Sequence, residues 1–218
     1  MTFGTVYTFP QNPRAAKAAI AAKYAGVELS IPQFDIGTEN KTPEYIAKFP
    51  TGQVPAFEND KTNLFESNAI AFYVASQGDA KLLGATKECT AEVLQWLFFI
   101  SNRIDGPLAQ WLYPILGFVP YNKGAYHKAV NDIKGAFTVL NAALLHKTYL
   151  VGESITLADI VLGATLSVGF TTVLAPEHVG SYKNLMRYVK TLYAQPQFKD
   201  VLGEIVFATS EKKYAPPS

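Results

Sequence analysis

The first 77 residues of the chain alternate between short apolar stretches and stretches that carry helix signals. Strands are expected where apolar and polar residues alternate, or where a short apolar run is bounded by turn residues. Helices are expected where Asn, Thr or Ser precedes a run of helix formers, with proline at the first helical position in some cases. The expected strands are 3–8, 27–31, 54–57 and 63–65, and the expected helices are 13–25, a short one that opens at Thr42-Pro43, and 68–76 capped by Ser67.

The order of these elements is β-α-β-α-β-β-α, which is typical of a thioredoxin-like layered domain. A polar stretch around Gly78-Asp79 follows, and every element expected after it is a helix. These expected helices are roughly 88–112, 124–146, 156–173, 182–194 and 196–201. The sequence therefore predicts a thioredoxin-like α/β domain at residues 1–79 and an all-α domain at residues 88–218.

Composition and charge argue against several classes of protein. Hydrophobic residues make up 49% of the chain and charged residues 17%, a balance typical of globular proteins and not of disordered ones. Nineteen basic residues face eighteen acidic ones without a basic cluster, so direct nucleic-acid binding is not expected. The longest apolar stretch, 155–170, contains Thr156 and Asp159 and falls short of the roughly 20 apolar residues of a membrane span. The N-terminus lacks the positive segment of a signal peptide, so we expect a soluble, intracellular protein.

Cysteine and histidine are scarce. Cys89 is the only cysteine, which precludes an internal disulfide and fits a reducing compartment. The three histidines, His127, His146 and His178, lack the spacing of metal ligands. We therefore expect no metal site and interpret the histidines as surface or interface residues.

One local pattern indicates a binding site for a small peptide. Pro55 begins a strand although proline cannot donate to the strand ladder. If the Val54–Pro55 bond is cis, the Val54 amide and carbonyl face outward and can pair with an extended peptide. Glu66 and Ser67 stand at a helix start, where Ser67 could hold a carboxylate and Glu66 an ammonium group. Alone, Pro55 is a turn residue and Ser67 an N-cap, but together the two features favour a site for a γ-glutamyl thiol peptide.

Three short motifs resemble those of the glutathione transferase superfamily, nearest its phi and theta-like members. They are Asn40-Lys41-Thr42-Pro43-Glu44, Gly52-Gln53-Val54-Pro55-Ala56 and Phe65-Glu66-Ser67-Asn68-Ala69-Ile70. The segment 149–160 is similar to the folding motif of that superfamily, with Thr156 as N-cap and Asp159 as its reciprocal N3 residue. The resemblance implies the glutathione transferase fold, and glutathione or a related thiol peptide bound between the domains. It also implies that Lys41 and Gln53 reach the glycine carboxylate of that ligand.

Transferase chemistry requires a thiolate, which a hydroxyl or thiol just after the first strand stabilises in members of this superfamily. No serine or cysteine occurs between residues 1 and 29 of this chain. Asn12 and Arg14 are the candidate catalytic residues, because an amide could donate to the thiolate and a guanidinium could add positive charge. A plain N-cap explains Asn12 equally well, and Arg14 could simply be solvated. Tyr7 is interpreted as a residue of the core or the sheet face, so catalytic competence and transferase activity stay open.

Four further segments, 4–12, 21–26, 111–118 and 195–204, resemble the N-terminal region of the gamma subunits of eukaryotic translation elongation factor 1. That branch implies a cytoplasmic scaffold that holds the guanine-nucleotide-exchange subunit, with the start of a linker at residues 211–218. The superfamily implies a homodimer. The alternative is a free-standing phi/theta-like transferase that conjugates a thiol peptide to electrophiles. The aromatic segment 111–121 is expected either to plug its own fold or to face a partner.

Overall fold

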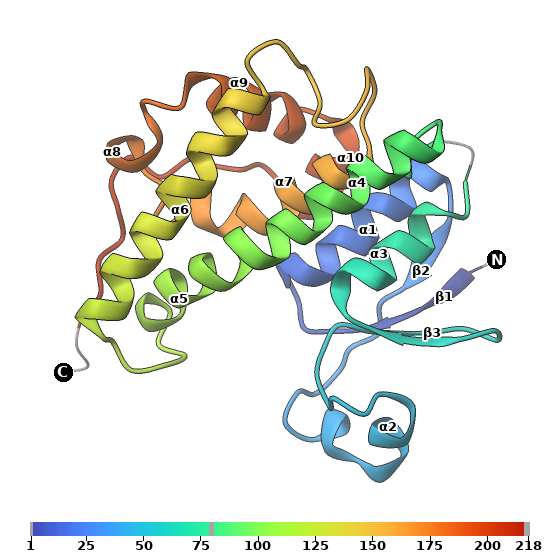
Figure 1. Ribbon diagram of the computed structural model, residues 1–218. Coiled ribbons are helices and arrows are strands. Elements are labelled where there is room, and N and C mark those ends of the chain that lie inside the picture. Colours follow the sequence, from blue (N-terminus) through green and yellow to red (C-terminus); the bar gives the residue numbers. More distant parts are fainter. Residues whose placement is uncertain (1, 79–80, 216–218) are drawn as a thin grey trace.

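A four-stranded sheet with helices on both faces forms the N-terminal part of the computed structural model, which describes residues 2–78 and 81–215 (Figure 1). The strands are β1 (Thr2–Tyr7), β2 (Glu28–Ser30), β3 (Ala56–Glu58) and β4 (Asn63–Phe65), in the spatial order β2-β1-β3-β4. Strand β1 pairs in parallel with β2 and antiparallel with β3, and β3 pairs antiparallel with β4. The expected thioredoxin-like order is confirmed.

Helices α1 (Pro13–Ala25) and α3 (Ser67–Ala75) cover one face of the sheet, and α2 (Pro43–Lys48) lies on the other, after a short 3-10 turn, η1 (Glu39–Lys41) (Figure 1). Tyr45 of α2 and Phe49 just after it form a small buried cluster with Ala56 of β3, and Tyr7 packs against this cluster. Strand β3 begins two residues later than expected, because Pro55 has no N–H for the ladder. The prediction that Ser67 caps α3 is wrong, since Glu66 is the N-cap residue and Ser67 is the first helical residue.

The rest of the described chain is helical. Its elements are α4 (Lys87–Ile100), a π-helical segment η2 (Ser101–Asp105), α5 (Gly106–Ile115), α6 (Lys123–Ala143), α7 (Leu157–Phe170), α8 (Pro176–Val179), α9 (Lys183–Tyr193) and α10 (Pro196–Leu202). The expected helix 88–112 is therefore longer and contains a π segment, and the short α8 was not expected. The fold class is confirmed. The domain boundaries at residues 1–79 and 88–218 stay a prediction, and Asp79 lies outside the described residues.

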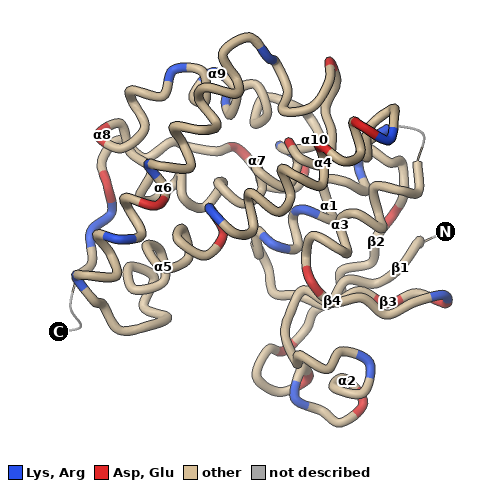
Figure 2. Tube along the Cα trace, in the orientation of Figure 1, with Lys and Arg blue, Asp and Glu red and all other residues tan. Residues whose placement is uncertain are grey.

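Helix α7 is the centre of the molecule, and almost every residue in it is buried. It packs against α1 of the N-terminal part and against α4 and α9, so one apolar core runs through both parts of the chain. Basic and acidic residues are interspersed along both parts of the chain trace (Figure 2). Over residues 2–78 and 81–215, none of the helices combines the length and apolar character needed to cross a membrane.

Asp159, at the start of α7, connects three segments through its buried carboxylate. It accepts hydrogen bonds from the Leu150 N–H (2.8 Å), the Thr156 N–H (2.8 Å) and the Tyr188 hydroxyl (2.7 Å). The Thr156 hydroxyl donates to the same carboxylate at 2.9 Å. Thr156 is the N-cap and Asp159 the N3 residue, as the sequence predicts. The role of this pair is therefore to fix the loop before α7 and to join it to α9.

We expect Asp159→Ala to lower the free energy of unfolding by on the order of 3 kcal/mol, because it leaves several buried donors without an acceptor. Thr156→Ala removes only one hydroxyl from the pair and should cost about 1 kcal/mol. Chemical denaturation of both variants measures the difference. Equal midpoints for the wild type and Asp159→Ala would contradict this role.

The C-terminal strap, residues 203–215, lies across the helical part of the molecule (Figure 1). Its backbone donates from Ala208 to the Phe170 carbonyl (2.7 Å) and from Lys212 to the Thr172 carbonyl (2.9 Å). Near its end, the Tyr214 ring stacks on Tyr121 with centroids 4.7 Å apart. The expectation that a linker begins at residue 211 is therefore wrong for residues 211–214, which pack on the fold. Residues 216–218 lie outside the described part of the chain.

Glu211 is the main polar anchor of this strap, with its side chain 7% exposed. Its carboxylate accepts hydrogen bonds from Trp111 Nε1 (3.1 Å) and the Tyr126 hydroxyl (2.6 Å), and pairs with His178 Nε2 at 3.1 Å. His178 was expected to be a surface or interface residue; its side chain is 13% exposed and packs on the Trp111 ring, so the surface alternative is wrong. Potential ligand atoms of Glu177, His178 and Glu211 lie within 4.8 Å of one another, but Trp111, Tyr126 and His178 already use the Glu211 oxygens.

We expect the contribution of Glu211 to stability to disappear in acid. Burial raises the pKa of this carboxyl, but the hydrogen bonds from Tyr126, His178 and Trp111 lower it more, so the net pKa is below the ordinary 4.5. The folded state then binds a proton less readily than the unfolded state, and the stabilisation is full above about pH 4.5 and is lost as the pH falls through the lowered pKa.

Glu211→Gln should therefore lower stability by on the order of 2 kcal/mol near neutral pH, and the difference from wild type should shrink below pH about 4.5. Thermal unfolding across pH measures it. Glu204→Gln, on the exposed start of the strap, is the control and should leave the pH profile unchanged. A wild-type profile parallel to that of Glu211→Gln at all pH values would refute the assignment.

Candidate functional site

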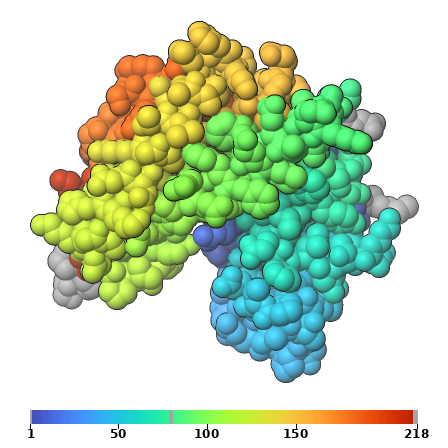
Figure 3. Space-filling model, viewed as in Figure 1, coloured from blue at the N-terminus to red at the C-terminus, as the bar shows by residue number. Residues whose placement is uncertain are grey.

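A cavity of about 670 Å³ lies between the α/β part and the helical part. In the space-filling view it appears as a notch between the blue α2 region and the green helices (Figure 3). Its walls come from the β1–α1 loop, the segments around α2, the start of α3, the π segment and α5. The cavity therefore requires both parts of the chain.

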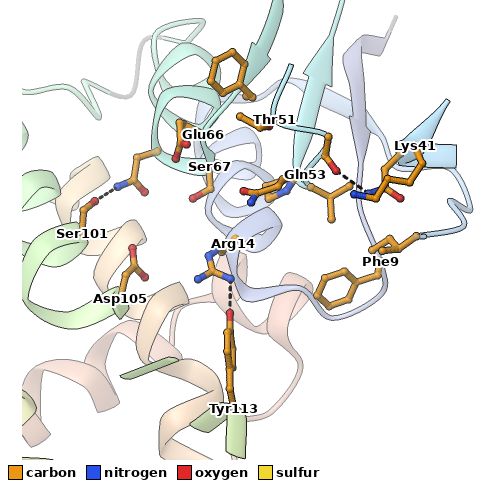
Figure 4. A pocket seen from close by; sticks show the side chains of 17 residues that line it. Phe9, Arg14, Lys41, Thr51, Gln53, Glu66, Ser67, Ser101, Asp105 and Tyr113 are labelled. Carbon is orange, nitrogen blue, oxygen red and sulfur yellow. Dashed lines mark hydrogen bonds between the residues drawn. The ribbon is translucent and has the colours of Figure 1, made fainter. Parts of the chain in front are cut away.

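All six residues predicted to bind glutathione line this one cavity, and so does one of the two predicted catalytic residues (Figure 4). The six are Lys41, Gln53, Val54, Pro55, Glu66 and Ser67, and the seventh is Arg14. Asn12 does not line it. The sequence thus identified residues that converge in space, although up to 53 positions separate them along the chain (Arg14 to Ser67).

The Val54–Pro55 bond is cis, as the peptide-binding hypothesis requires. Two side chains hold the loop before it, because Asn40 Nδ2 donates to the Gly52 carbonyl (2.7 Å) and the Tyr45 hydroxyl donates to the Gln53 carbonyl (2.9 Å). Within the described residues, neither the N–H nor the C=O of Val54 has a hydrogen-bond partner. Both groups are thus available to an extended ligand in the cavity.

The start of α3 presents unpaired amides and two polar side chains. Glu66 has φ 71° and ψ 112°, in the left-handed region that residues other than glycine rarely adopt. The first helical hydrogen bond runs from the Ile70 N–H to the Glu66 carbonyl, so the amides of residues 67–69 have no intrahelical acceptor. No side chain caps this helix, which leaves the Ser67 hydroxyl outside any capping bond. This end of α3 is suited to an anionic group.

Arg14 crosses from α1 to the helical part, where its Nη1 donates to the Tyr113 hydroxyl on α5 at 2.8 Å (Figure 4). Burial alone would lower the pKa of the guanidinium. The hydrogen bond from Arg14 to Tyr113 and the nearby carboxylates of Asp105 and Glu66 outweigh burial and raise it. Arg14 is therefore a fixed positive charge at the cavity and not a solvated side chain, which answers the alternative left open by the sequence.

A polar network lies behind the cavity. Lys17 of α1 is 1% exposed, and its Nζ contacts Asp105 Oδ2 at 3.2 Å and Asn68 Oδ1 at 3.0 Å. Asn68 Nδ2 in turn donates to Ser101 Oγ at 2.8 Å, and Asp105 Oδ1 accepts from the Thr165 hydroxyl at 3.2 Å. Burial lowers the pKa of Lys17, and Asp105 opposes that effect. The network joins α1, α3, α7 and the π segment.

Sequence reasoning missed Ser101 and Asp105 as site residues. Both belong to the π segment, and both line the cavity. Such segments are rare and often occur at functional sites. The one available signal was the group of polar residues at positions 101, 102, 103 and 105, which follows the apolar stretch 96–100.

Asn12 is 5% exposed, and its carboxamide is already engaged at both ends. Its Oδ1 accepts from the Arg14 N–H at 3.0 Å, and its Nδ2 donates to Thr8 Oγ1 at 3.0 Å. The structure therefore favours the N-cap alternative for Asn12 over a role as donor to a thiolate. Tyr7 donates to Glu58 Oε2 (3.2 Å) and packs among aromatic rings, which agrees with its interpretation as a residue of the sheet face.

A second, more apolar cavity of about 570 Å³ adjoins the first. Phe9, Arg14, Asp105 and Tyr113 line both cavities, so these residues stand at their junction. Leucines of α5 and Phe118 form much of the second cavity. A polar cavity with a fixed cation thus opens directly onto an apolar one.

Comparison with known proteins agrees with this architecture. Residues 3–76 match the family model of the glutathione S-transferase N-terminal domain, and residues 69–196 match that of the C-terminal domain. Human elongation factor 1-gamma is 43% identical over 210 residues, which is 94% of this chain and 47% of that protein. The chain therefore spans about half the length of the curated relatives it matches.

Two solved structures are similar over nearly the whole chain. The glutathione S-transferase-like domain of elongation factor 1-gamma from Saccharomyces cerevisiae is 25% identical, with a TM-score of 0.81 over 100% of both chains. Glutathione S-transferase I from maize, in complex with an atrazine glutathione conjugate, is 25% identical, with a TM-score of 0.82 over 93% of this chain and 97% of that one. The predicted resemblance to the gamma subunits of elongation factor 1 is confirmed, and the chain belongs to the glutathione S-transferase family.

Proposed function

We propose that this chain is the transferase-like part of a cytoplasmic elongation factor 1 gamma-type subunit. In this proposal it holds the guanine-nucleotide-exchange subunit and binds glutathione or a related thiol peptide in the cavity of about 670 Å³. The observation that carries the proposal is the 43% identity to elongation factor 1-gamma over 94% of the chain. The predicted peptide-binding residues converge in one cavity, which supports the proposal that glutathione or a related thiol peptide binds there.

Each end of a γ-glutamyl thiol peptide has a chemical counterpart in the cavity. The Ser67 hydroxyl and the free amides of α3 suit the γ-glutamyl carboxylate, and Glu66 suits its ammonium group. The unpaired amide and carbonyl of Val54 suit the backbone of the central residue. Lys41 and Gln53 suit the carboxylate at the far end. The proposal uses every predicted binding residue, with Pro55 shaping the loop.

We expect Glu66→Ala to weaken glutathione binding by about 2 kcal/mol, roughly 30-fold, because the ligand ammonium then has no anionic partner. Isothermal titration calorimetry measures the loss. Glu44→Ala, an exposed acid on α2 away from the cavity lining, is the matched control and should bind like wild type. Indistinguishable isotherms for Glu66→Ala and wild type, or no heat with either, would reject the glutathione site.

The segment 111–121 offers a surface for the exchange subunit. Trp111 and Leu112 are buried and plug the fold, as one alternative expected. Phe118, in contrast, is 70% exposed, and Val119 beside it is also exposed. Exposed aromatic side chains are typical anchors of protein interfaces. The second half of the segment therefore supports the other alternative, a contact with a partner.

We expect the purified chain to capture purified exchange subunit, and Glu66→Ala to capture it equally well, because Glu66 lines the polar cavity and the exposed Phe118 and Val119 do not. Phe118→Ser should weaken capture roughly 10-fold or more, as loss of an interface anchor does. Val206→Ser removes an exposed apolar side chain from the strap and serves as the control. Biolayer interferometry measures the affinities. No capture by the wild type, together with brisk transferase turnover, would instead indicate the detoxifying enzyme.

That second candidate is a free-standing phi/theta-like transferase that conjugates a thiol peptide to electrophiles. The specific observation in its favour is the apolar cavity of about 570 Å³ that adjoins the polar one, since an apolar electrophile fits there. Weak transferase activity is also compatible with the scaffold proposal, so turnover alone does not separate the two candidates. Capture of the exchange subunit does.

We also propose a homodimer. Leu94 and Phe98 are exposed and lie four residues apart on one face of α4, and Phe65 is exposed on β4. Exposed large apolar side chains of this kind support self-association.

A further inference from the structure

The contact between Arg14 and Tyr113 lies where the polar and the apolar cavity meet. Arg14 comes from the first turn of α1 and Tyr113 from α5, and 99 positions separate them in the sequence. In the close view, the Arg14 guanidinium lies between Tyr113 on one side and Ser67 and Gln53 on the other (Figure 4). The pair thus occupies the boundary at which a thiol held in the first cavity would meet a molecule held in the second.

The hydrogen bond between them leaves one donor unused. A guanidinium can only donate, so the Tyr113 oxygen is the acceptor of the 2.8 Å contact. The hydroxyl hydrogen of Tyr113 is not used in that bond, and no described residue accepts it. A hydroxyl polarised by a cationic donor is a stronger donor itself. Its natural acceptor is an anionic atom at the junction of the cavities.

Few side chains can compete for this role. Of the four residues that line both cavities, Phe9 has no polar hydrogen. Asp105 is an acceptor already occupied by Lys17 and Thr165, and a carboxylate would repel an anion. Asn12, the expected amide donor, is buried and bonded to Thr8. Arg14 and Tyr113 are therefore the two hydrogen-bond donors among the residues that line both cavities.

We propose that the Tyr113 hydroxyl, polarised by Arg14, is the donor that stabilises the thiolate of a bound γ-glutamyl thiol peptide. It takes the place of the serine or cysteine that residues 1–29 lack. The inference rests on the proposed glutathione site and extends it to a residue of the helical part. The second substrate is an electrophile with an apolar body, which the leucines of α5 and Phe118 would contact.

With chlorodinitrobenzene as the probe electrophile, the proposed reaction replaces the chlorine of the ring by the sulfur of the thiol peptide. The thiol proton leaves to water, and the sulfur keeps the electron pair while Tyr113 donates a hydrogen bond to it. The sulfur then forms a bond to the ring carbon, and chloride departs with the electrons of the carbon–chlorine bond. Tyr113 keeps its proton throughout, and no oxidant or metal is needed.

The direct test is the titration of the bound thiol, followed by the ultraviolet absorbance of the thiolate in the glutathione complex across pH. In Tyr113→Phe the thiol should titrate about one pH unit higher than in wild type, because a donor to the anion is lost. Affinity for glutathione should stay within about twofold, and kcat/KM for chlorodinitrobenzene should fall roughly 10-fold to 100-fold. Tyr121→Phe, outside both cavities, is the matched control and should behave like wild type.

Arg14→Lys keeps a charge without the bidentate fork and should give an intermediate titration. Circular dichroism and the melting temperature show that each variant is folded. Glutathione bound by Tyr113→Phe with an unchanged thiol titration would overturn the role of Tyr113 and leave the proposed binding site intact. No glutathione binding by the wild type, measured calorimetrically, would overturn the binding site and this inference together.

Discussion

The buried ion pair between Lys17 and Asp105 fixes how the two parts of the chain meet. Lys17 belongs to α1 and Asp105 to the π segment, and the same ammonium group holds Asn68 at the start of α3. A charge this deeply buried is costly unless it is paired, and loss of one partner typically costs about 3–5 kcal/mol. The pair therefore penalises any sliding of the helical part relative to the sheet. The cavity walls keep their relative positions because of it.

That constraint explains why polar groups gather at one place. Asn68 follows Glu66 and Ser67 directly, so the contact with Lys17 also sets the position of the first turn of α3. Asp105 is four residues from Ser101, and both reach the cavity because the π segment widens the helix there. Arg14 lies one turn before Lys17 on α1, which points it toward α5. One buried pair thus positions side chains from four elements.

Much of the fold could be predicted because its signals are local. Asn12-Pro13, Thr42-Pro43 and the pair Thr156 with Asp159 mark helix starts, and the observed helices begin there. Ser67 lies at the start of α3, as expected, but it is the first helical residue and not the N-cap. Glu66, with its unusual φ, occupies the N-cap position one residue earlier. Local patterns do not encode this backbone conformation.

The parts that could not be predicted depend on contacts between distant residues. Tyr113 reads as one aromatic residue among several in 111–121, and only the fold brings it to Arg14. Glu211 reads as the start of a charged tail, yet it is buried because Trp111 and Tyr126 donate to it from 100 and 85 positions away. Asp105 belongs to the site because it pairs with Lys17, which lies 88 positions earlier in the sequence. No window of sequence contains both members of such a pair.

The strap also determines how the molecule carries mechanical load. A pull applied at residue 215 reaches Tyr214, then the Lys212 N–H bonded to Thr172, and then Glu211, whose single carboxylate is held by α5, α6 and α8 together. The bonds to this carboxylate share the force in parallel and do not open one after another. The tension is spread over three helices before it reaches α10, and the helix that receives part of it through Trp111 also carries Tyr113 two residues later.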